Sequence, residues 1–170
     1  MPDGTTELED AALAEEGSKY DRLGGIVADG VVGAAGGLVG VAMMTVVLLV
    51  AESFGAFSRE SFGALARLVG LGGLVPEVTV GYLIFLAGGM FPWPLLFASL
   101  KEYLPGDSWP VAGVFFGTAL WTGFVGAFYA GFGGVSLVLY LVLTLVAHWV
   151  YGASLGLVFS YLSERPDTLV

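Results

Sequence analysis

Long apolar runs separated by short charged segments dominate this chain. Residues 30–51, 78–100 and 108–162 contain no Asp, Glu, Lys or Arg. A helix needs about 20 consecutive apolar residues to cross the hydrocarbon core of a bilayer, so the first two runs fit one span each and the third fits two. Runs such as VAMMTVVLLVA lack the alternation that a transmembrane β-strand requires. The pattern predicts an all-α integral membrane bundle of four transmembrane helices.

The predicted organisation is one transmembrane domain between two tails. Residues 1–22 are expected to form an acidic N-terminal tail, residues 23–164 the four-helix domain, and residues 165–170 a C-terminal tail. The charges and turn residues that flank the apolar runs define the spans. We expect these spans at about 24–52, 78–102, 109–130 and 136–163.

The segment between the first two spans has an amphipathic pattern. Ser58 or Ser61 could cap a short helix, because serine side chains accept hydrogen bonds from free backbone amides. Four apolar residues would then share one face of that helix: Phe62, Leu65, Leu68 and Val69. This pattern is typical of a helix that lies in the membrane interface.

The second span contains helix-breaking residues at its centre. Gly88 and Gly89 precede Pro92 and Pro94, and each proline removes one backbone donor and crowds the preceding turn. A kink is therefore expected near residues 88–91. The break is either a static kink or an unwound site of the kind that transporters use to bind substrate.

Three glycine pairs with GxxxG spacing predict where the helices touch. Small residues let helix backbones approach closely in lipid. The pairs are Gly36 and Gly40, Gly113 and Gly117, and Gly152 and Gly156. They favour contacts within the bundle, although the last pair could also join two copies of the chain.

A weak internal repeat accompanies these pairs. Gly36, Gly40 and Thr45 recur in the third span as Gly113, Gly117 and Thr122. Two tandem helical hairpins would produce this spacing. Chance matching between glycine-rich helices is the alternative.

His148, the chain's one histidine, is the main candidate for chemistry. Ionisable side chains within spans usually face the bundle interior and often mark functional paths. His148 could accept or relay a proton, ligate a metal or haem, or pack as a neutral ring bonded to another helix. Tyr151 adds a hydroxyl one turn away. Without a second histidine, only a methionine (Met43, Met44 or Met90) could complete a haem site, so packing is the preferred interpretation.

The amino-acid composition narrows the classes of function that the chain could have. Hydrophobic residues make up 56% of the 170 residues, the mean hydropathy is +0.86 and the net charge is −9. The acidic balance disfavours nucleic acid as a partner. The absence of cysteine excludes disulfides and thiolate sites. No nucleophile elbow, Walker loop or HExxH motif is present, so we expect no enzyme activity, no bound metal and no cofactor.

The distribution of basic residues predicts the orientation. Lys19, Arg22, Lys101 and Arg165 lie on the side of the two termini, whereas Arg59 and Arg67 lie on the other. The positive-inside rule then places both termini in the cytoplasm and the protein in the cell membrane as a multi-pass protein.

Three stretches resemble a family of small four-span membrane proteins common in halophilic archaea. They are GGLVGVAMMTVVLLVA (36–51), GYLIFLAGGMFPWPLLFASLKEYLPG (81–106) and LVAHWVYGASLGLVFSYL (145–162). The last stretch contains the resembling pattern His-x-x-Tyr-Gly-x-x-Leu-Gly at residues 148–156. Phe85 stands where the resemblance would place a second histidine, which argues against a cofactor held by paired histidines. The resemblance implies a membrane location, a salt-rich source and, for some members of the family, an association with respiratory oxidase gene groups.

These observations support an ordered set of functions. The preferred one is a non-enzymatic accessory or assembly subunit of a larger membrane complex, in contact with lipid and with other membrane proteins or further copies of itself. The alternative is a small oligomeric transporter or channel that uses the kinked second span and His148. A haem-binding redox protein is third.

Overall fold

The computed structural model describes residues 30–163, and this part of the chain is helical without any strand. Contacts divide the chain into residues 1–31 and 32–170, and the bundle described below belongs to the second unit. Residues 30–163 contain four segments long and apolar enough to cross a membrane: Gly30–Ser53, Glu77–Tyr103, Trp109–Ala127 and Val135–Leu162. The predicted all-α architecture with four spans is therefore confirmed. The predicted tails lie outside the described residues.

The helices have these bounds. The first span is the helix Gly30–Ser53. It is followed by α2 (Ser61–Leu68), α3 (Glu77–Met90), α4 (Pro92–Leu100), the short 3₁₀ helix η1 (Lys101–Tyr103), α5 (Trp109–Ala127) and α6 (Val135–Ser163). The second span is thus α3, α4 and η1 in succession, interrupted at Phe91 (φ −116°, ψ −73°).

The third span is shorter than predicted. Helix α5 begins after Ser108, which occupies the N-cap position, although its side chain makes no capping hydrogen bond. The helix ends at Ala127, before the predicted residue 130. Gly131 and Gly134 have positive φ values of 79° and 56°, a conformation that glycine adopts without steric cost. The chain therefore leaves the helix before this glycine-rich turn.

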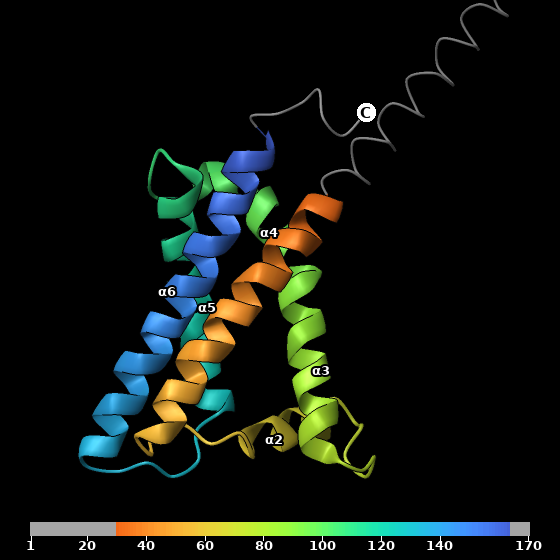
Figure 1. Ribbon diagram of the computed structural model, residues 1–170, viewed down its shortest axis with the longest axis vertical. Coiled ribbons are helices and arrows are strands. Elements are labelled where there is room, and N and C mark those ends of the chain that lie inside the picture. The colour runs from red at the N-terminus through yellow and green to blue at the C-terminus, as the bar shows by residue number, and fades with distance from the viewer. Residues whose placement is uncertain (1–29, 164–170) are drawn as a thin grey trace, which may run out of the picture. The chain divides into compact units, whose positions relative to one another are not determined.

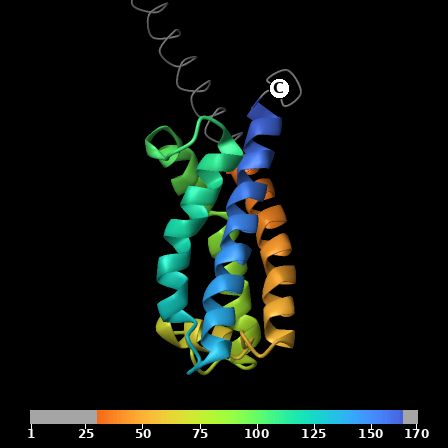
Figure 2. The ribbon, with the colours of Figure 1, turned by 90° about the vertical axis from the view of Figure 1, so that its left-hand side faces the viewer.

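Helix α6 lies between α5 and the first span (Figures 1 and 2). Successive spans run in opposite directions. The first span and α5 have α6 on one side and the two helices of the second span, α3 and α4, on the other. The short helix α2 crosses the lower end of the bundle in Figure 1. Short connections join the second span to the third and the third to the fourth, whereas residues 54–76, which include α2, join the first span to the second.

Helices α5 and α6 touch backbone to backbone at glycines. A methyl group built on Gly113 would overlap the Gly152 carbonyl, and one built on Gly152 would overlap the Gly113 carbonyl; each would lie 2.6 Å from the other's carbonyl carbon. A methyl group on Gly117 would lie 2.9 Å from the carbonyl carbon of His148, and one on Gly156 would lie 2.6 Å from that of Trp109. Any larger residue at these positions would force the helices apart.

Glycines on the first span face two different helices. A methyl group on Gly36 would meet Leu155 of α6 at 3.0 Å, and one on Gly40 would meet the ring of Tyr151 at 2.8 Å. Gly37 faces the other way, where a methyl group would lie 2.7 Å from the Cα atom of Met90 at the end of α3. The first span therefore packs against α6 and against the break in the second span at once.

Helix α2 differs from the expectation in its cap and its role. Its N-cap is Glu60 and no side chain caps it, so neither Ser58 nor Ser61 has the predicted function. Ser61 lies inside the helix and donates a 3.3 Å hydrogen bond to the carbonyl oxygen of Phe128. Phe62 is buried, whereas Leu68 is 75% exposed. The predicted apolar face is therefore split, and its N-terminal part packs against the bundle.

Ion pairs hold this end of the bundle. Arg59 pairs with Glu52 at 2.6 Å, and Arg67 pairs with Glu77. The hydrogen bond to the Glu52 carboxylate raises the pKa of Arg59 above its ordinary value. Arg67 belongs to α2 and Arg59 lies two residues before that helix, which crosses the lower end of the bundle in Figure 1.

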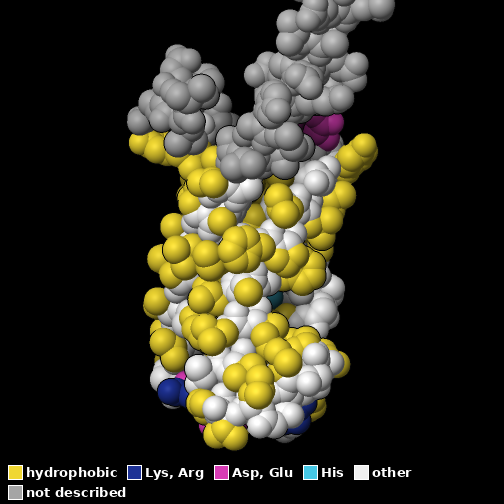
Figure 3. All heavy atoms as spheres, turned by 90° about the vertical axis from the view of Figure 1, so that its right-hand side faces the viewer, with side chains coloured by type: hydrophobic (Ala, Val, Ile, Leu, Met, Phe, Trp, Pro, Cys, Tyr) yellow, Lys and Arg dark blue, Asp and Glu magenta, His cyan; other side chains and the backbone are white. Residues whose placement is uncertain are grey.

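Apolar side chains cover the flank of the bundle. Figure 3 shows this flank as largely hydrophobic, with Lys and Arg at its lower end. Large exposed apolar residues occur on every span, among them Val46, Leu83, Val111 and Leu157. Such a surface is stable in lipid and is not expected on a protein in water. The described residues therefore form a multi-pass membrane protein.

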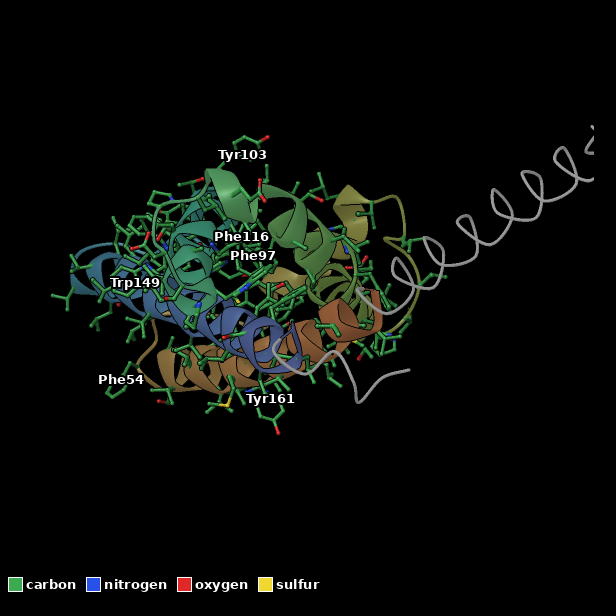
Figure 4. All side chains as sticks on the ribbon, turned by 90° about the horizontal axis from the view of Figure 1, so that it is seen from above. Phe54, Phe97, Tyr103, Phe116, Trp149 and Tyr161 are labelled. Atoms are coloured by element: carbon green, nitrogen blue, oxygen red, sulfur yellow. The ribbon has the colours of Figure 1, made fainter. Side chains whose placement is uncertain are left out.

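Aromatic residues fill the interior between α4, α5 and α6. Phe97 and Phe116 are buried with ring centroids 5.2 Å apart, and Figure 4 shows both labelled inside the bundle, near one another. Phe97 also packs edge-on against Phe159 at 5.8 Å. By contrast, Tyr103 and Tyr161 project outward at the periphery. Helix α4 is thus held against α5 and α6 by rings.

Replacing Gly113 by alanine should destabilise the bundle by about 1–3 kcal/mol, the usual cost of overpacking a tight contact. The reason is that the new methyl group would meet the backbone of Gly152, which cannot rotate away. The free energy of unfolding in mixed micelles, followed by circular dichroism during titration with a denaturing detergent, measures this effect.

The control is Gly126→Ala on the same helix, where a methyl group has nothing within 4 Å. Its effect should stay within about 0.5 kcal/mol. Equal stability of the two variants would contradict the close contact between α5 and α6.

Candidate functional site

A cavity of about 480 Å³ lies between the spans. Every span contributes to its wall: Val41 and Met44 from the first, Phe85, Gly88 and Gly89 from α3, Phe124 from α5, and His148 and Tyr151 from α6. Its lining is almost entirely apolar and contains no charged side chain. This size lies within the usual range of small-molecule sites, about 300–1,000 Å³.

The cavity opens to the apolar flank of the bundle. Among its lining residues, Trp93 at the start of α4 and Thr122 and Gly123 on α5 are exposed, which places the opening between α5 and the second span near its break. Figure 3 shows a trace of cyan, the colour of histidine, within a hollow of the hydrophobic face. The opening thus faces the region that lipid would occupy.

The break in the second span explains why this space exists. Beyond the break, α4 is packed against α5 through Phe97 and Phe116. Before the break, α3 stands apart from α5, as Figure 1 shows, and the cavity lies between them. Pro92 has no N–H, so the Gly88 carbonyl has no amide donor four residues later in the chain. An uninterrupted helix would have one direction along its whole length.

His148 lies in the cavity wall with only 4% of its surface exposed. Its Nδ1 atom lies 2.7 Å from the carbonyl oxygen of Thr144, one turn earlier on the same helix. A carbonyl oxygen only accepts, so Nδ1 carries the proton and donates. The ring also meets Phe124 edge-on at 4.7 Å. The expectation of a bond to another helix was therefore wrong: the partner is the helix's own backbone.

Thr144 anchors the turn below His148. Its hydroxyl donates to the carbonyl oxygen of Tyr140 at 2.6 Å and accepts a 3.0 Å hydrogen bond from Nε1 of Trp121 on α5. Sequence reasoning missed Thr144 and Trp121. The four-residue spacing of Tyr140, Thr144 and His148 was available as a signal, because it aligns them on one helix face.

Tyr151 connects α6 to the break. Its hydroxyl donates a 2.8 Å hydrogen bond to the carbonyl oxygen of Gly89, and both groups are buried. The ring reaches α3 across the first span because Gly40 leaves room for it. A second inter-helix tie of this type joins Thr45 and Tyr82, whose hydroxyl oxygens are 3.1 Å apart. Thr45 also donates to the carbonyl oxygen of Val41, one turn earlier on its own helix, at 2.7 Å.

Phe85 belongs to an aromatic cluster at the α2 end of the cavity. Its ring lies 5.2 Å from that of Phe62 and 5.9 Å from that of Phe128. Phe85 and His148 both line the cavity, so the structure places the residue at the expected second-histidine position in the same site. Leu65 of α2 lines the cavity at this end together with Phe85 and Phe128.

The other candidate residues have different positions. Gly88, Gly89, His148 and Tyr151 come together at the cavity. Gly36, Gly113, Gly117, Gly152 and Gly156 lie in helix contacts outside it, and Pro94 packs near Gly33 and Gly37. Met44 lines the cavity, whereas Met43 is 50% exposed. Within residues 30–163, no three His, Asp or Glu side chains are close enough to hold a metal ion.

Tyr151→Phe should lower the free energy of unfolding by about 0.6–1.7 kcal/mol, the range found for hydrogen bonds between membrane helices. The ring would remain, and only the donor to the Gly89 carbonyl would be lost. Tyr103→Phe, at a residue that is 83% exposed, is the matched control and should leave stability unchanged. If both variants were as stable as the original protein, the tie between α6 and the break would have no energetic role.

Comparison with known proteins identifies a family but no characterised relative. No curated protein and no solved structure matches the chain. One family model, described as a family of unknown function (DUF6789), matches residues 27–170 and so includes all four spans and the whole cavity. The chain belongs to this family, DUF6789.

Proposed function

We propose that this protein is a non-enzymatic integral membrane protein that binds an apolar, lipid-soluble molecule in the cavity at the helix break. The cavity itself is the observation that supports this function. It has the volume of a ligand site, an apolar lining and an opening toward the lipid-facing flank. A molecule dissolved in the bilayer could enter between α5 and the second span, near its break, without crossing water.

The lining favours this function over an ion channel or a transporter of polar solutes. Pathways for ions use charged rings or converging carbonyl groups. Here no charged side chain lines the cavity, and the hydroxyls of Tyr151 and Thr122 are already bonded to backbone carbonyls. The rings of Phe62, Phe85 and Phe128 also pack against one another at the α2 end, which leaves no polar path visible there among the described residues.

A role as an accessory or assembly subunit of a larger membrane complex, including a respiratory one, is the second candidate. The exposure of the second span favours this accessory role. Only 17% of its most apolar stretch is buried, less than in the other three spans. Its outward side chains, such as Leu83 and Leu95, could contact another membrane protein. This role is compatible with ligand binding in the cavity.

Fluorine NMR with a fluorinated hexylbenzene in lipid nanodiscs tests the proposed function. Gly123 lines the cavity near its opening and has space for a side chain, so Gly123→Leu should narrow the site. We expect a bound probe signal with the original protein, absent from protein-free nanodiscs, and at least a fivefold loss of affinity in the variant, because a lost or gained group in an apolar pocket changes binding by about 1–3 kcal/mol.

Gly126→Leu is the matched control. It lies one turn further along α5, is equally unobstructed and does not line the cavity, so it should bind the probe normally. Failure of the original protein to bind the probe, or equal loss in both variants, would refute the proposed function. Mild-detergent purification from the native host, followed by identification of stoichiometric partners, tests the accessory role independently.

A further inference from the structure

The cavity wall contains one deeply buried side-chain atom that the protein leaves unbonded. Nε2 of His148 makes no hydrogen bond within residues 30–163, whereas Nδ1 is bonded to Thr144. No fully enclosed side-chain nitrogen or oxygen in this part of the chain lacks a partner. Nε2 therefore retains access to open space, and the open space beside His148 is the cavity.

The bond at Nδ1 determines what Nε2 can do. A neutral imidazole has one N–H, and in His148 this N–H is on Nδ1 and donates its hydrogen bond to the Thr144 carbonyl. The ring is expected to be neutral because an isolated charge among apolar side chains is costly. Nε2 is therefore an acceptor, and only a group with a proton to donate can satisfy it.

The surrounding polar groups do not supply that proton. Tyr151 donates its hydroxyl to the Gly89 carbonyl, and Thr122 donates its hydroxyl to the Ala119 carbonyl. The indole N–H of Trp93 lies on a residue that is 41% exposed near the opening, where it can meet groups outside the cavity. Gly88 also lines the cavity, and its carbonyl, a further acceptor, has no amide donor four residues later because that residue is Pro92. The indole N–H of Trp93 is thus an open donor at the opening of the cavity, whereas Nε2 of His148 is an acceptor that no donor of the described lining satisfies.

On this basis we propose that the ligand is an apolar alcohol or phenol, whose hydroxyl group donates a hydrogen bond to Nε2 of His148 while its hydrocarbon part fills the cavity. This inference rests on the proposed function and specifies its ligand class. A pure hydrocarbon leaves Nε2 unsatisfied, and a ketone or ester adds another acceptor. A carboxylate would bring an unpaired charge among apolar side chains.

The uniqueness of His148 makes a direct measurement possible. With nitrogen-labelled histidine and no histidine in a purification tag, the ring gives two nitrogen signals, since the chain has one histidine. The probe is a fluorinated hexylphenol, and its reference is the fluorinated hexylbenzene that lacks only the hydroxyl. We expect the phenol to move the unprotonated nitrogen signal toward that of a hydrogen-bonded nitrogen, and we expect the hydrocarbon to leave it in place.

Affinity provides the second measurement. The phenol should bind the original protein about three- to tenfold more tightly than the hydrocarbon, the usual worth of one hydrogen bond. Each affinity is referred to partitioning into protein-free nanodiscs. His148→Phe should abolish this preference while both probes still bind. If that variant fails to fold, the nitrogen spectrum of the original protein decides the question without it.

The outcomes separate the two proposals. If both probes bind in a manner sensitive to Gly123→Leu, but without preference and without a shift at Nε2, the ligand class proposed here is wrong and the apolar site stands. If neither probe binds, the proposed function itself fails. A stoichiometric Soret band in protein purified from its host would show a haem at His148 and would overturn the inference.

Discussion

The close approach of α5 and α6 at glycine is the constraint on which the rest of the bundle depends. Gly113 and Gly152 leave no room for a methyl group, because each faces the other's backbone carbonyl. In lipid, helices gain little from hiding apolar surface, so contact distance and packing determine which faces meet. This contact orients α6, whose opposite side then presents Tyr151 and Leu155 to the first span.

The second span is attached differently. Helix α4 is held by the packing of Phe97 against the ring of Phe116. Helix α3 is held by the close contact at Gly89 and by two hydrogen bonds: Tyr151 donates to the Gly89 carbonyl, and the hydroxyl of Thr45 bonds to that of Tyr82 on α3. The two halves of this span can have different directions because the chain is interrupted at Phe91. The cavity follows from that difference: α4 fills the interior at one end of the bundle, and α3 leaves it open nearer to α2.

Within the cavity, hydrogen bonding to the local backbone determines which polar groups the site presents to a ligand. The Thr144 carbonyl binds the N–H of His148, and the proline at position 92 removes the donor that Gly88 would otherwise have. The first effect leaves Nε2 of His148 as an acceptor at a wall that is otherwise almost entirely apolar. The proposed function and the proposed ligand class are two consequences of this arrangement, one from its shape and one from its unpaired nitrogen.

Several features follow from the sequence by itself, because they depend on residues close together in the chain. The four spans follow from charge-free length, the N-cap position of Ser108 from its place before Trp109 and Pro110, and the Thr45 bond to Val41 from four-residue spacing. Tertiary structure decided what depends on distant segments. It showed that Phe62 is buried under the bundle, that Gly36 and Gly37 face different helices, and that His148 borders a cavity. Hydropathy cannot distinguish these faces, because in a membrane protein the surface exposed to lipid is as apolar as the interior.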